Sequence, residues 1–378
     1  MKTKVSRAFA AQFGGEGILY GAPGRINLIG EHTDYNDGYV MPGAIDLGIV
    51  ASIRPNGEGV VRAYAMDLEQ GGEFTVGDST LPSQSWLRYI YGVCQEVQKR
   101  GGKVEGFDAL FAGDLPLGSG LSSSAALESV FGFAISDMFN GGEIDRFELA
   151  RIGQSTEHNY CGVKCGIMDQ FASLHGRKGH LMRLDCRSME YEYFPFESEE
   201  YRLVLINSNV KHELSGSPYN RRRESCERVA KELGMTSLRG ATMDQLLAIA
   251  DRVSDEDMHR AKYVIGEEQR VLGVCDALVK GDFERVGELM YATHMGLSKD
   301  YEVSCEELDF LNDIAKECGV TGSRMMGGGF GGCTINLVRG DKYNEFIATT
   351  LSKFKEKYGI DAGVIDVVIS DGARKLEE

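Results

Sequence analysis

The sequence lacks several features that mark special classes of protein. Its 378 residues contain only seven prolines and one tryptophan. No proline-, serine- or glycine-rich stretch is long enough to be a domain linker, and no internal repeat of fixed period is present. Apolar runs are too short to span a bilayer, and no long apolar segment follows the first residues. We therefore expect neither a membrane protein nor a secreted one.

Positively charged residues are also fewer than negatively charged ones. Lysine and arginine total 41 against 57 aspartates and glutamates, which gives a net charge of −16. Such an excess of negative charge makes nonspecific binding to nucleic acid or to an anionic membrane unfavourable. An anionic ligand would need a local site. With 42% apolar and 26% charged residues, the chain has an ordinary globular composition, and its length suits two domains or one large one.

The cysteines do not form a disulfide framework. There are nine, an odd number, and they are scattered except for Cys161 and Cys165. This usage is typical of reduced thiols in a cytoplasmic protein. A C-x₃-C pair can ligate a metal, but no second cysteine or histidine pair has a matching spacing. We interpret the cysteines as free structural thiols and expect a cytoplasmic protein.

Glycine is abundant. The 48 glycines are about 13% of the chain, compared with about 7% on average. They concentrate in three stretches, at 21–30, 113–120 and 327–332. Glycine is favoured where backbone must turn tightly or approach closely. Three such stretches, far apart in the sequence, predict one composite site.

The apolar periodicity predicts a mixed α+β chain. The clearest helix covers 122–140, where apolar residues recur at intervals of three and four before a glycine stop. Further helices are predicted at 84–100, 222–233, 243–252, 255–280, 282–292 and 305–317, and strands at 17–20, 25–29, 49–53, 59–64, 201–207, 333–338 and 364–369.

The first glycine stretch continues into a group of polar residues. A short buried strand is predicted to end in a loop that carries Glu31, His32 and Asp34, with Arg25 at its other end. Carboxylates and a neutral imidazole are acceptors that suit a polyhydroxylated ligand, whereas two close acids would repel a phosphate. The alternative is a solvated turn.

The second glycine stretch runs directly into the predicted helix at 122–140. A helix N-terminus presents unpaired N–H groups and the positive end of a dipole, so it can bind phosphate. The loop is not a Walker A motif, because Gly-Leu-Ser stands where Gly-Lys-Ser would be required. Its serine hydroxyls can cap the helix and ligate Mg²⁺. The alternative is an ordinary serine-capped buried helix.

The third stretch contains a G-x-G-x-x-G pattern at 327–332. A dinucleotide-binding turn would need a strand before it and a helix after it. We predict no strand before it, and the residues after it resemble a strand. A turn that lets backbone approach the other loops fits better.

Two further positions stand out. Asp169 lies among apolar neighbours, so it is either paired or chemically active, and Arg25 is its plausible partner. A structural salt bridge is the alternative. The triplet 221–223, which follows Tyr219, is three arginines, and we interpret it as a solvated helix start rather than a phosphate clamp.

Together these stretches resemble the GHMP family of small-molecule kinases, in the branch that phosphorylates galactose. GRINLIGEHTDY at 24–35 resembles that branch's sugar signature, PLGSGLSSSA at 116–125 the family's phosphate loop, and GGGFGGC at 327–333 its third motif. The resemblance implies a two-domain α+β fold with the active site in the cleft between the domains. We place these domains at 1–195 and 196–378.

The resemblance also implies an activity. MgATP would phosphorylate the anomeric hydroxyl of α-D-galactose, the first step of galactose catabolism by the Leloir pathway. Asp169 would accept the hydroxyl proton, and Arg25 would hold that carboxylate ionised and stabilise the transferring phosphoryl group. The sugar-binding residues implied are Glu31, His32, Thr33, Asp34, Gly166, Asp169 and Tyr219.

The implied partners are galactose and ATP, and the implied metal is Mg²⁺. Ser124 and Glu157 would ligate the Mg²⁺, with Ser123 as the second candidate for the serine ligand. Trp86 and Tyr89 share a helical face and resemble the pair that lines the adenine pocket, although a core position fits them equally well. The ATP phosphates would be wrapped by Gly118, Ser119, Gly120, Leu121, Ser122, Ser123 and Ser124.

Two alternatives remain at this stage. Another sugar-1-kinase, for example one acting on N-acetylgalactosamine, would keep the same catalytic residues and enlarge the pocket. A non-catalytic sensor of sugar and ATP would tend to be altered in the second motif. The intact serine run, Asp169 and Arg25 favour an enzyme. We expect a monomer that binds neither nucleic acid nor membrane.

Overall fold

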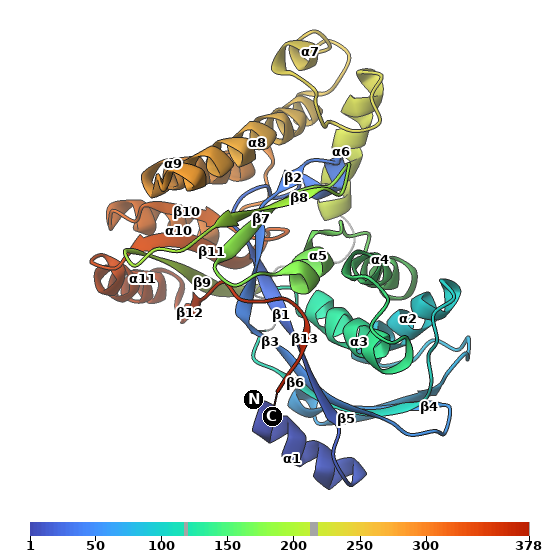
Figure 1. Cartoon of the computed structure of the whole chain (residues 1–378). Coiled ribbons are helices and arrows are strands. Elements are labelled where there is room, and N and C mark those ends of the chain that lie inside the picture. The colour runs from blue at the N-terminus through green and yellow to red at the C-terminus, as the bar shows by residue number, and fades with distance from the viewer. Residues whose placement is uncertain (117–119, 212–217, 378) are drawn as a thin grey trace.

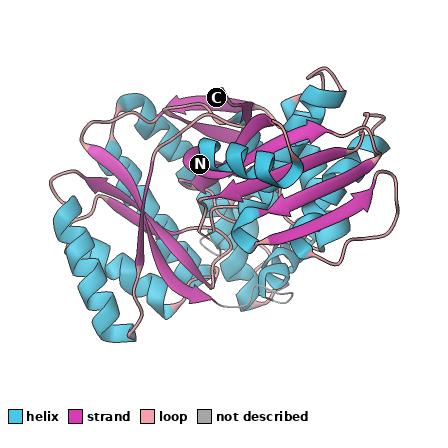
Figure 2. Ribbon diagram, turned by 90° about the horizontal axis from the view of Figure 1, so that it is seen from below, coloured by secondary structure: helices cyan, strands magenta, loops and turns pink. Residues whose placement is uncertain are grey.

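The computed structural model describes residues 1–116, 120–211 and 218–377. Helices pack around three β-sheets (Figure 1). In the view of Figure 2 the strands fall into two main groups, one on each side of the molecule. The architecture is the α+β one predicted from the sequence.

The first sheet has six strands in the order β13-β1-β3-β6-β4-β5. All neighbouring pairs are antiparallel except β4 and β6, which are parallel. The strands are β1 (Ile18–Asn27), β3 (Pro42–Pro55), β4 (Val60–Ala65), β5 (Gln70–Thr75), β6 (Phe107–Gly113) and β13 (Arg374–Lys375).

Helices cover both faces of this sheet. Because side chains alternate along a strand, Leu110 packs under α1 while Phe111 packs in the core on the other face. On that second face α3 and α5 lie directly against β1 and β3. The helices of this half are α1 (Lys2–Phe13), α2 (Ser85–Lys99), α3 (Ser123–Phe139), α4 (Arg146–Thr156) and α5 (Met168–His175).

The second sheet has four antiparallel strands in the order β10-β11-β9-β12. They are β9 (Tyr201–Lys211), β10 (Gly322–Met325), β11 (Gly331–Arg339) and β12 (Gly363–Val367). The helices of this half are α6 (Pro218–Glu232), α7 (Met243–Leu247), α8 (Asp255–Lys280), α9 (Phe283–Met295), α10 (Glu306–Glu317) and α11 (Tyr343–Tyr358). A third, small sheet joins β2 (Tyr39–Val40), β7 (His180–Asp185) and β8 (Tyr191–Pro195).

Three local predictions need correction. The helix predicted at 222–233 begins earlier, as α6, so Tyr219 lies in its first turn. The helix predicted at 243–252 is only the short α7. A strand, β10, does precede the third glycine stretch, contrary to our prediction. Because that stretch leads into another strand, β11, with Met325 paired to Thr334, the two strands form a hairpin and not a strand–helix nucleotide turn.

The end of the chain returns to the first half. In β13, Lys375 pairs with Tyr20 of β1, and Lys2 donates a hydrogen bond to the carbonyl of Glu377. The two termini therefore lie close together (Figure 1). Residues of both halves also share one continuous apolar core. Our division at 195/196 stays a prediction. It assigns β13 to the second domain, although this strand pairs with β1 in the first sheet.

The structure bears on two expectations from the sequence, one about the cysteines and one about membrane-spanning segments. The nine cysteines all lie within the described residues, and each is a free thiol. No helix in the described part of the chain combines the length and the apolar character needed to cross a membrane.

Candidate active site

The three glycine stretches meet at one place, as their composition predicted. The backbone N–H of Arg25 donates a hydrogen bond of 3.2 Å to the carbonyl of Leu121, and the N–H of Gly327 donates one of 2.8 Å to Oε1 of Glu31. A Cβ on Gly24 would lie 2.6 Å from the Leu121 carbonyl oxygen, so no larger residue fits there without a shift. The glycines thus allow three distant segments to lie in contact at one place.

A cavity of about 590 Å³ opens where these segments meet. A hollow of about 750 Å³ lies elsewhere, beside β9 and β12, and is lined by none of the predicted site residues. We therefore place the candidate site in the smaller cavity. The predicted residues that line it are Arg25, Glu31, His32, Asp34, Ser124, Glu157, Gly166, Asp169 and Tyr219.

An arginine–aspartate pair forms one wall. Arg25 Nε donates to Oδ1 of Asp169 over 2.7 Å, and Arg25 Nη2 donates to Oδ2 over 2.8 Å. The remaining Nη1 donates to the carbonyl of Gly120. Burial disfavours the charged guanidinium, but the nearby carboxylates, Asp169 first, outweigh it and raise the pKa of Arg25. The pair is bidentate, which fixes the position of each carboxylate oxygen.

The start of α3 supplies a third donor to this carboxylate. Ser122 precedes the helix in a left-handed conformation, with φ of 60°, and its side chain makes no capping hydrogen bond. Its hydroxyl instead donates to Oδ2 of Asp169 over 2.5 Å. The prediction of a serine cap is therefore wrong for Ser122. Because the Ser122 hydroxyl is bonded to Asp169, it does not cap the N–H groups in the first turn of α3.

Two further acids, Glu157 and Glu128, lie near the start of α3. The Ser124 hydroxyl donates a hydrogen bond of 2.9 Å to Oε1 of Glu157. The Gln170 amide donates hydrogen bonds of 3.4 Å to Glu157 and 3.0 Å to Glu128. Burial, opposed by the Ser124 hydrogen bond, raises the pKa of Glu157 to about 7. Burial, together with the charge of Glu157, also raises the pKa of Glu128 well above its usual range. A cation beside Glu157 would favour the ionised form of this carboxyl group and so lower its pKa.

The loop that follows β1 carries the sugar-signature residues. Gly166 comes so close to Asp34 that an added Cβ would lie 1.8 Å from a carboxylate oxygen. His32 has φ of 63°, and its Nδ1 shares a hydrogen bond with the Tyr35 hydroxyl over 2.7 Å. Burial, followed by the charge of Arg222, lowers the pKa of His32 to about 3. The imidazole is therefore neutral at physiological pH.

Asp34 lies close to two other acids. Burial first, and then the charge of Asp169, raise its pKa to about 7, while Arg25 acts in the opposite direction. Because the acid has lost part of its solvation and faces another carboxylate, its ionised form needs hydrogen-bond donors. The hydroxyl groups of a bound ligand would provide them.

This shift gives a testable pH dependence. The usual pKa of Asp34 is 3.8, so between about pH 4 and 7 the unfolded chain is ionised at this position while the folded protein is not. The stability contributed by this group is complete below pH 4 and is lost as the pH rises to 7. We expect Asp34→Asn to stabilise the unliganded protein by about 1–2 kcal/mol more at pH 8 than at pH 5, relative to wild type. Urea unfolding at the two pH values measures this, and an unchanged pH slope would contradict it.

Several predicted residues do not line the cavity. Thr33 is fully buried, and its hydroxyl lies 2.8 Å from the Gly30 carbonyl and 2.6 Å from the Tyr39 carbonyl, which holds the loop together. Gly120, Leu121, Ser122 and Ser123 are also absent from the cavity lining, although Gly120 and Ser122 bond to the Arg25–Asp169 pair. Gly118 and Ser119 lie outside the described residues.

Neither residue of the aromatic pair predicted for the adenine pocket lines the cavity. Trp86 is 8% exposed, packs against Phe111 and donates its indole N–H to Gln70 over 3.1 Å. Tyr89 is half-buried beside Cys161. The core interpretation describes Trp86 better, because little of its ring remains open to a ligand.

The arginine triplet is not uniformly solvated. Arg222 is 7% exposed, donates to the carbonyls of Tyr301 and Glu302, and stacks over Phe330. Our interpretation of a solvated helix start is therefore wrong for Arg222, which ties α6 to the segment after α9.

Sequence reasoning missed three residues that shape the site: Gln170, Glu128 and Arg324. Gln170 adjoins Asp169, but its two acidic partners come from other helices. Arg324 comes just before the third glycine stretch and is bonded to Glu31, 293 residues away. The sequence offered only an arginine next to a glycine-rich turn as a signal.

Comparisons with known proteins agree with this geometry. The galactokinase galactose-binding signature matches residues 7–55, the GHMP kinases N terminal domain matches 88–177, and the GHMP kinases C terminal domain matches 275–357. The galactokinase of Thermotoga petrophila is 42% identical and covers 94% of this chain and 99% of its own. That of Bacillus subtilis is 38% identical over the full length of both chains.

Solved structures point the same way. Lactococcus lactis galactokinase, crystallised with galactose, has a TM-score of 0.94 at 35% identity and covers 99% of this chain and all of its own. Methanococcus jannaschii mevalonate kinase shares the fold at a TM-score of 0.67 and 18% identity, over 94% of this chain and 99% of its own. With three matched family models and full-length relatives above 30% identity, this chain belongs to the galactokinase family of GHMP kinases.

Proposed function

We propose that this chain catalyses the MgATP-dependent phosphorylation of α-D-galactose at its anomeric hydroxyl, giving α-D-galactose 1-phosphate and ADP. The observation that carries the proposal is the bidentate Arg25–Asp169 pair. It lies in the cavity wall between the acceptor-rich sugar loop and the N-terminus of α3. Sugar and phosphate would thus reach the same pair from opposite sides.

The sugar side of the cavity suits a polyhydroxylated ligand. Asp34 and Glu31 offer carboxylate oxygens, and the neutral His32 adds an imidazole. The Tyr219 ring lies 5.4 Å from that of His32, so an apolar surface faces these polar groups. Gly166 keeps the opposite backbone close to Asp34. Alternating polar and flat apolar surfaces are expected in a sugar site.

In the proposed transfer step Asp169 takes the proton. Each carboxylate oxygen has two lone pairs, so the bonds from Arg25 and Ser122 leave acceptor capacity for the sugar hydroxyl. The anomeric oxygen attacks the γ-phosphorus, the bond from that phosphorus to the bridging oxygen of ADP breaks, and Asp169 receives the hydroxyl proton. Arg25 places a buried positive charge beside the transferring group. A loose transition state needs this positioning and charge balance more than a strong base.

The phosphate side is the start of α3. Its first N–H groups and dipole favour an anion, and Gly120 leaves space for backbone to approach phosphate oxygens. The phosphate-binding roles of Gly120, Leu121, Ser122, Ser123 and Ser124 remain proposals, as do those of Gly118 and Ser119.

The residues behind this helix start fit a magnesium ion. Mg²⁺ in kinases is commonly held by one or two protein oxygen ligands together with substrate phosphates. Ser124 and Glu157 provide a hydroxyl and a carboxylate 2.9 Å apart, and burial raises the pKa of Glu157, so a nearby cation would favour its ionised form. When bound there, Mg²⁺ would neutralise charge on the ATP phosphates. No group of three or more histidine, cysteine or acidic residues in the described chain forms a protein-only metal site.

We expect Glu157→Gln to weaken the magnesium dependence more than the sugar affinity. The amide keeps the size of the side chain and can still accept from Ser124, but it carries no charge. The Mg²⁺ concentration that gives half-maximal rate should rise by about 10-fold or more, with galactose KM within about threefold of wild type. Rates measured over a magnesium series at saturating ATP test this. An unchanged magnesium dependence would remove Glu157 from the metal site.

A substrate panel tests the proposed function. The rate of ADP release would be measured with MgATP and galactose, N-acetylgalactosamine, glucose, mevalonate or homoserine. We expect galactose to give the highest kcat/KM. Preference for N-acetylgalactosamine would instead identify the related sugar-1-kinase, whose pocket must accommodate the acetamido group at the second carbon. Sugar binding without ADP release would identify a sensor.

A further inference from the structure

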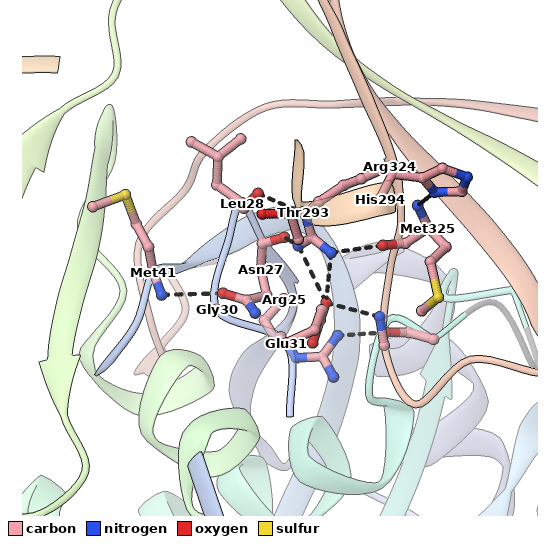
Figure 3. Close-up of polar contacts among 12 residues, drawn as sticks. Arg25, Asn27, Leu28, Gly30, Glu31, Met41, Thr293, His294, Arg324 and Met325 are labelled. Carbon is pink, nitrogen blue, oxygen red and sulfur yellow. Dashed lines mark hydrogen bonds and ion pairs between the residues drawn. The ribbon is translucent and has the colours of Figure 1, made fainter. Parts of the chain in front are cut away.

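Arg324 on β10 has an unusual set of partners. The side chain is fully buried, with no exposed surface. Its Nε donates a hydrogen bond of 2.8 Å to the Leu28 carbonyl, and Nη1 donates one of 2.6 Å to the Met325 carbonyl. Nη2 donates to the Asn27 carbonyl. Both Nη atoms also donate to Oε1 of Glu31, each over 3.2 Å (Figure 3). All five N–H donors of the guanidinium are therefore used.

This arrangement is poorly explained as a stabilising salt bridge. A buried ion pair loses much of its attraction to desolvation, and apolar residues of similar volume would often serve stability equally well. Beyond stability, this guanidinium helps to fix one oxygen of a cavity residue. Oε1 of Glu31 accepts both Nη bonds of Arg324 and the N–H of Gly327. Three donors at known positions leave the carboxylate little rotational freedom.

The other oxygen of Glu31 has a different environment. Among the described residues, Oε2 takes part in none of the recorded hydrogen bonds, and Glu31 lines the cavity although it is only 2% exposed. The backbone of the loop is held separately, because Tyr263 donates to the Glu31 carbonyl over 2.9 Å and Gly30 donates to Glu267 over 2.8 Å. Arg324 therefore controls the direction of the Glu31 carboxylate and not the course of the loop.

We infer that Arg324 is a positioning residue for sugar recognition: by holding Oε1 of Glu31 it directs Oε2 toward a hydroxyl of the bound sugar. The inference rests on the proposed function, because it takes the ligand of the cavity to be galactose. Arg324 itself does not line the cavity, so it acts through Glu31. The same guanidinium also joins the end of β1 to the strand that leads into the glycine turn at 327–332.

The first test separates sugar affinity from turnover. Lysine in place of Arg324 keeps the charge but has a single ammonium that cannot fork onto Glu31 and the backbone together. We expect R324K to raise galactose KM by about 10-fold or more, while kcat and ATP KM stay within about threefold of wild type. Arg260 provides a matched control, because it is 3% exposed and bonded to Ser225 on α6, and is absent from the cavity lining. R260K should show neither change.

A double-mutant cycle tests whether Arg324 acts through Glu31. We expect E31Q to raise galactose KM, and R324K added to E31Q to raise it by no more than about threefold further, because the partner's contribution is already lost. A purely structural role for Arg324 predicts that the two effects multiply. Multiplying effects, or R324K kinetics equal to those of R260K, would overturn the inference.

A measurement on the wild type covers the case in which R324K fails to fold. In ¹⁵N-labelled arginine spectra, the Nε signal of Arg324 should exchange slowly with solvent and shift on addition of galactose, while that of Arg260 should not shift. If galactose binds and the Arg324 signal does not move, the inference fails and the proposed function stands. If the wild type neither binds nor phosphorylates galactose, the proposed function fails and the inference with it.

Discussion

Asp169→Asn is expected to lower kcat with galactose by about 10³-fold or more and to leave galactose affinity within a few-fold of wild type. The amide has one oxygen where the carboxylate has two, so it cannot accept from Arg25 Nε, Arg25 Nη2 and the Ser122 hydroxyl in the same way. It also cannot take the hydroxyl proton. The sugar loop is built from other residues, so binding should largely persist.

Steady-state kinetics and calorimetric titration with galactose measure the two parts of this prediction. Asp108 offers a matched control, because it is a buried carboxylate, 4% exposed, that two arginines hold within the first sheet. Asp108→Asn should lower thermal stability and leave kcat within about threefold of wild type. If Asp169→Asn kept more than about a tenth of the wild-type kcat, Asp169 would not be the proton acceptor.

Arg25→Lys is expected to lower kcat by about 10²- to 10³-fold. Lysine keeps a positive charge, but it cannot donate two parallel bonds to Asp169 and a third to the Gly120 carbonyl. The carboxylate would then be free to rotate, and the charge would no longer lie at a fixed distance from the transferring phosphoryl group. Orientation and charge would be lost together, which is why a conservative change should have a large effect.

The same kinetic assay, with thermal melting alongside it, measures this effect. Arg62→Lys is the control, because Arg62 also pairs with a buried aspartate, Asp108, but in the first sheet away from the cavity. We expect Arg62→Lys to leave kcat unchanged within about twofold. A similar small effect for Arg25→Lys would show that the pair serves only stability, which is the structural salt bridge considered from the sequence.

Much of the site could be predicted because its residues carry local signals. Glycine marks close backbone approach, and the stretches around Gly24, Gly120 and Gly327 do meet. An acid among apolar neighbours requires a partner, and Asp169 has the predicted one in Arg25. These inferences need only composition and neighbouring residues.

Other features depend on contacts between distant segments. Ser122 has the appearance of a helix cap, and only the fold shows its hydroxyl bonded to Asp169. The strand β10 is four residues long, too short for periodicity to reveal, and Arg324 within it has partners almost 300 residues away. Trp86 shares a helical face with Tyr89, and that pattern fits a core residue and a ligand contact equally well.

The reaction that we assign to the cavity at Asp169 is the transfer of a phosphoryl group to galactose. The most direct measurement is ³¹P NMR of the wild-type protein incubated with MgATP and galactose. We expect the ATP signals to be replaced by those of ADP and of one new phosphate ester on the anomeric carbon, identical to α-D-galactose 1-phosphate, and Asp169→Asn to form almost none of this ester. No new ester from galactose, or an ester at another carbon, would contradict it.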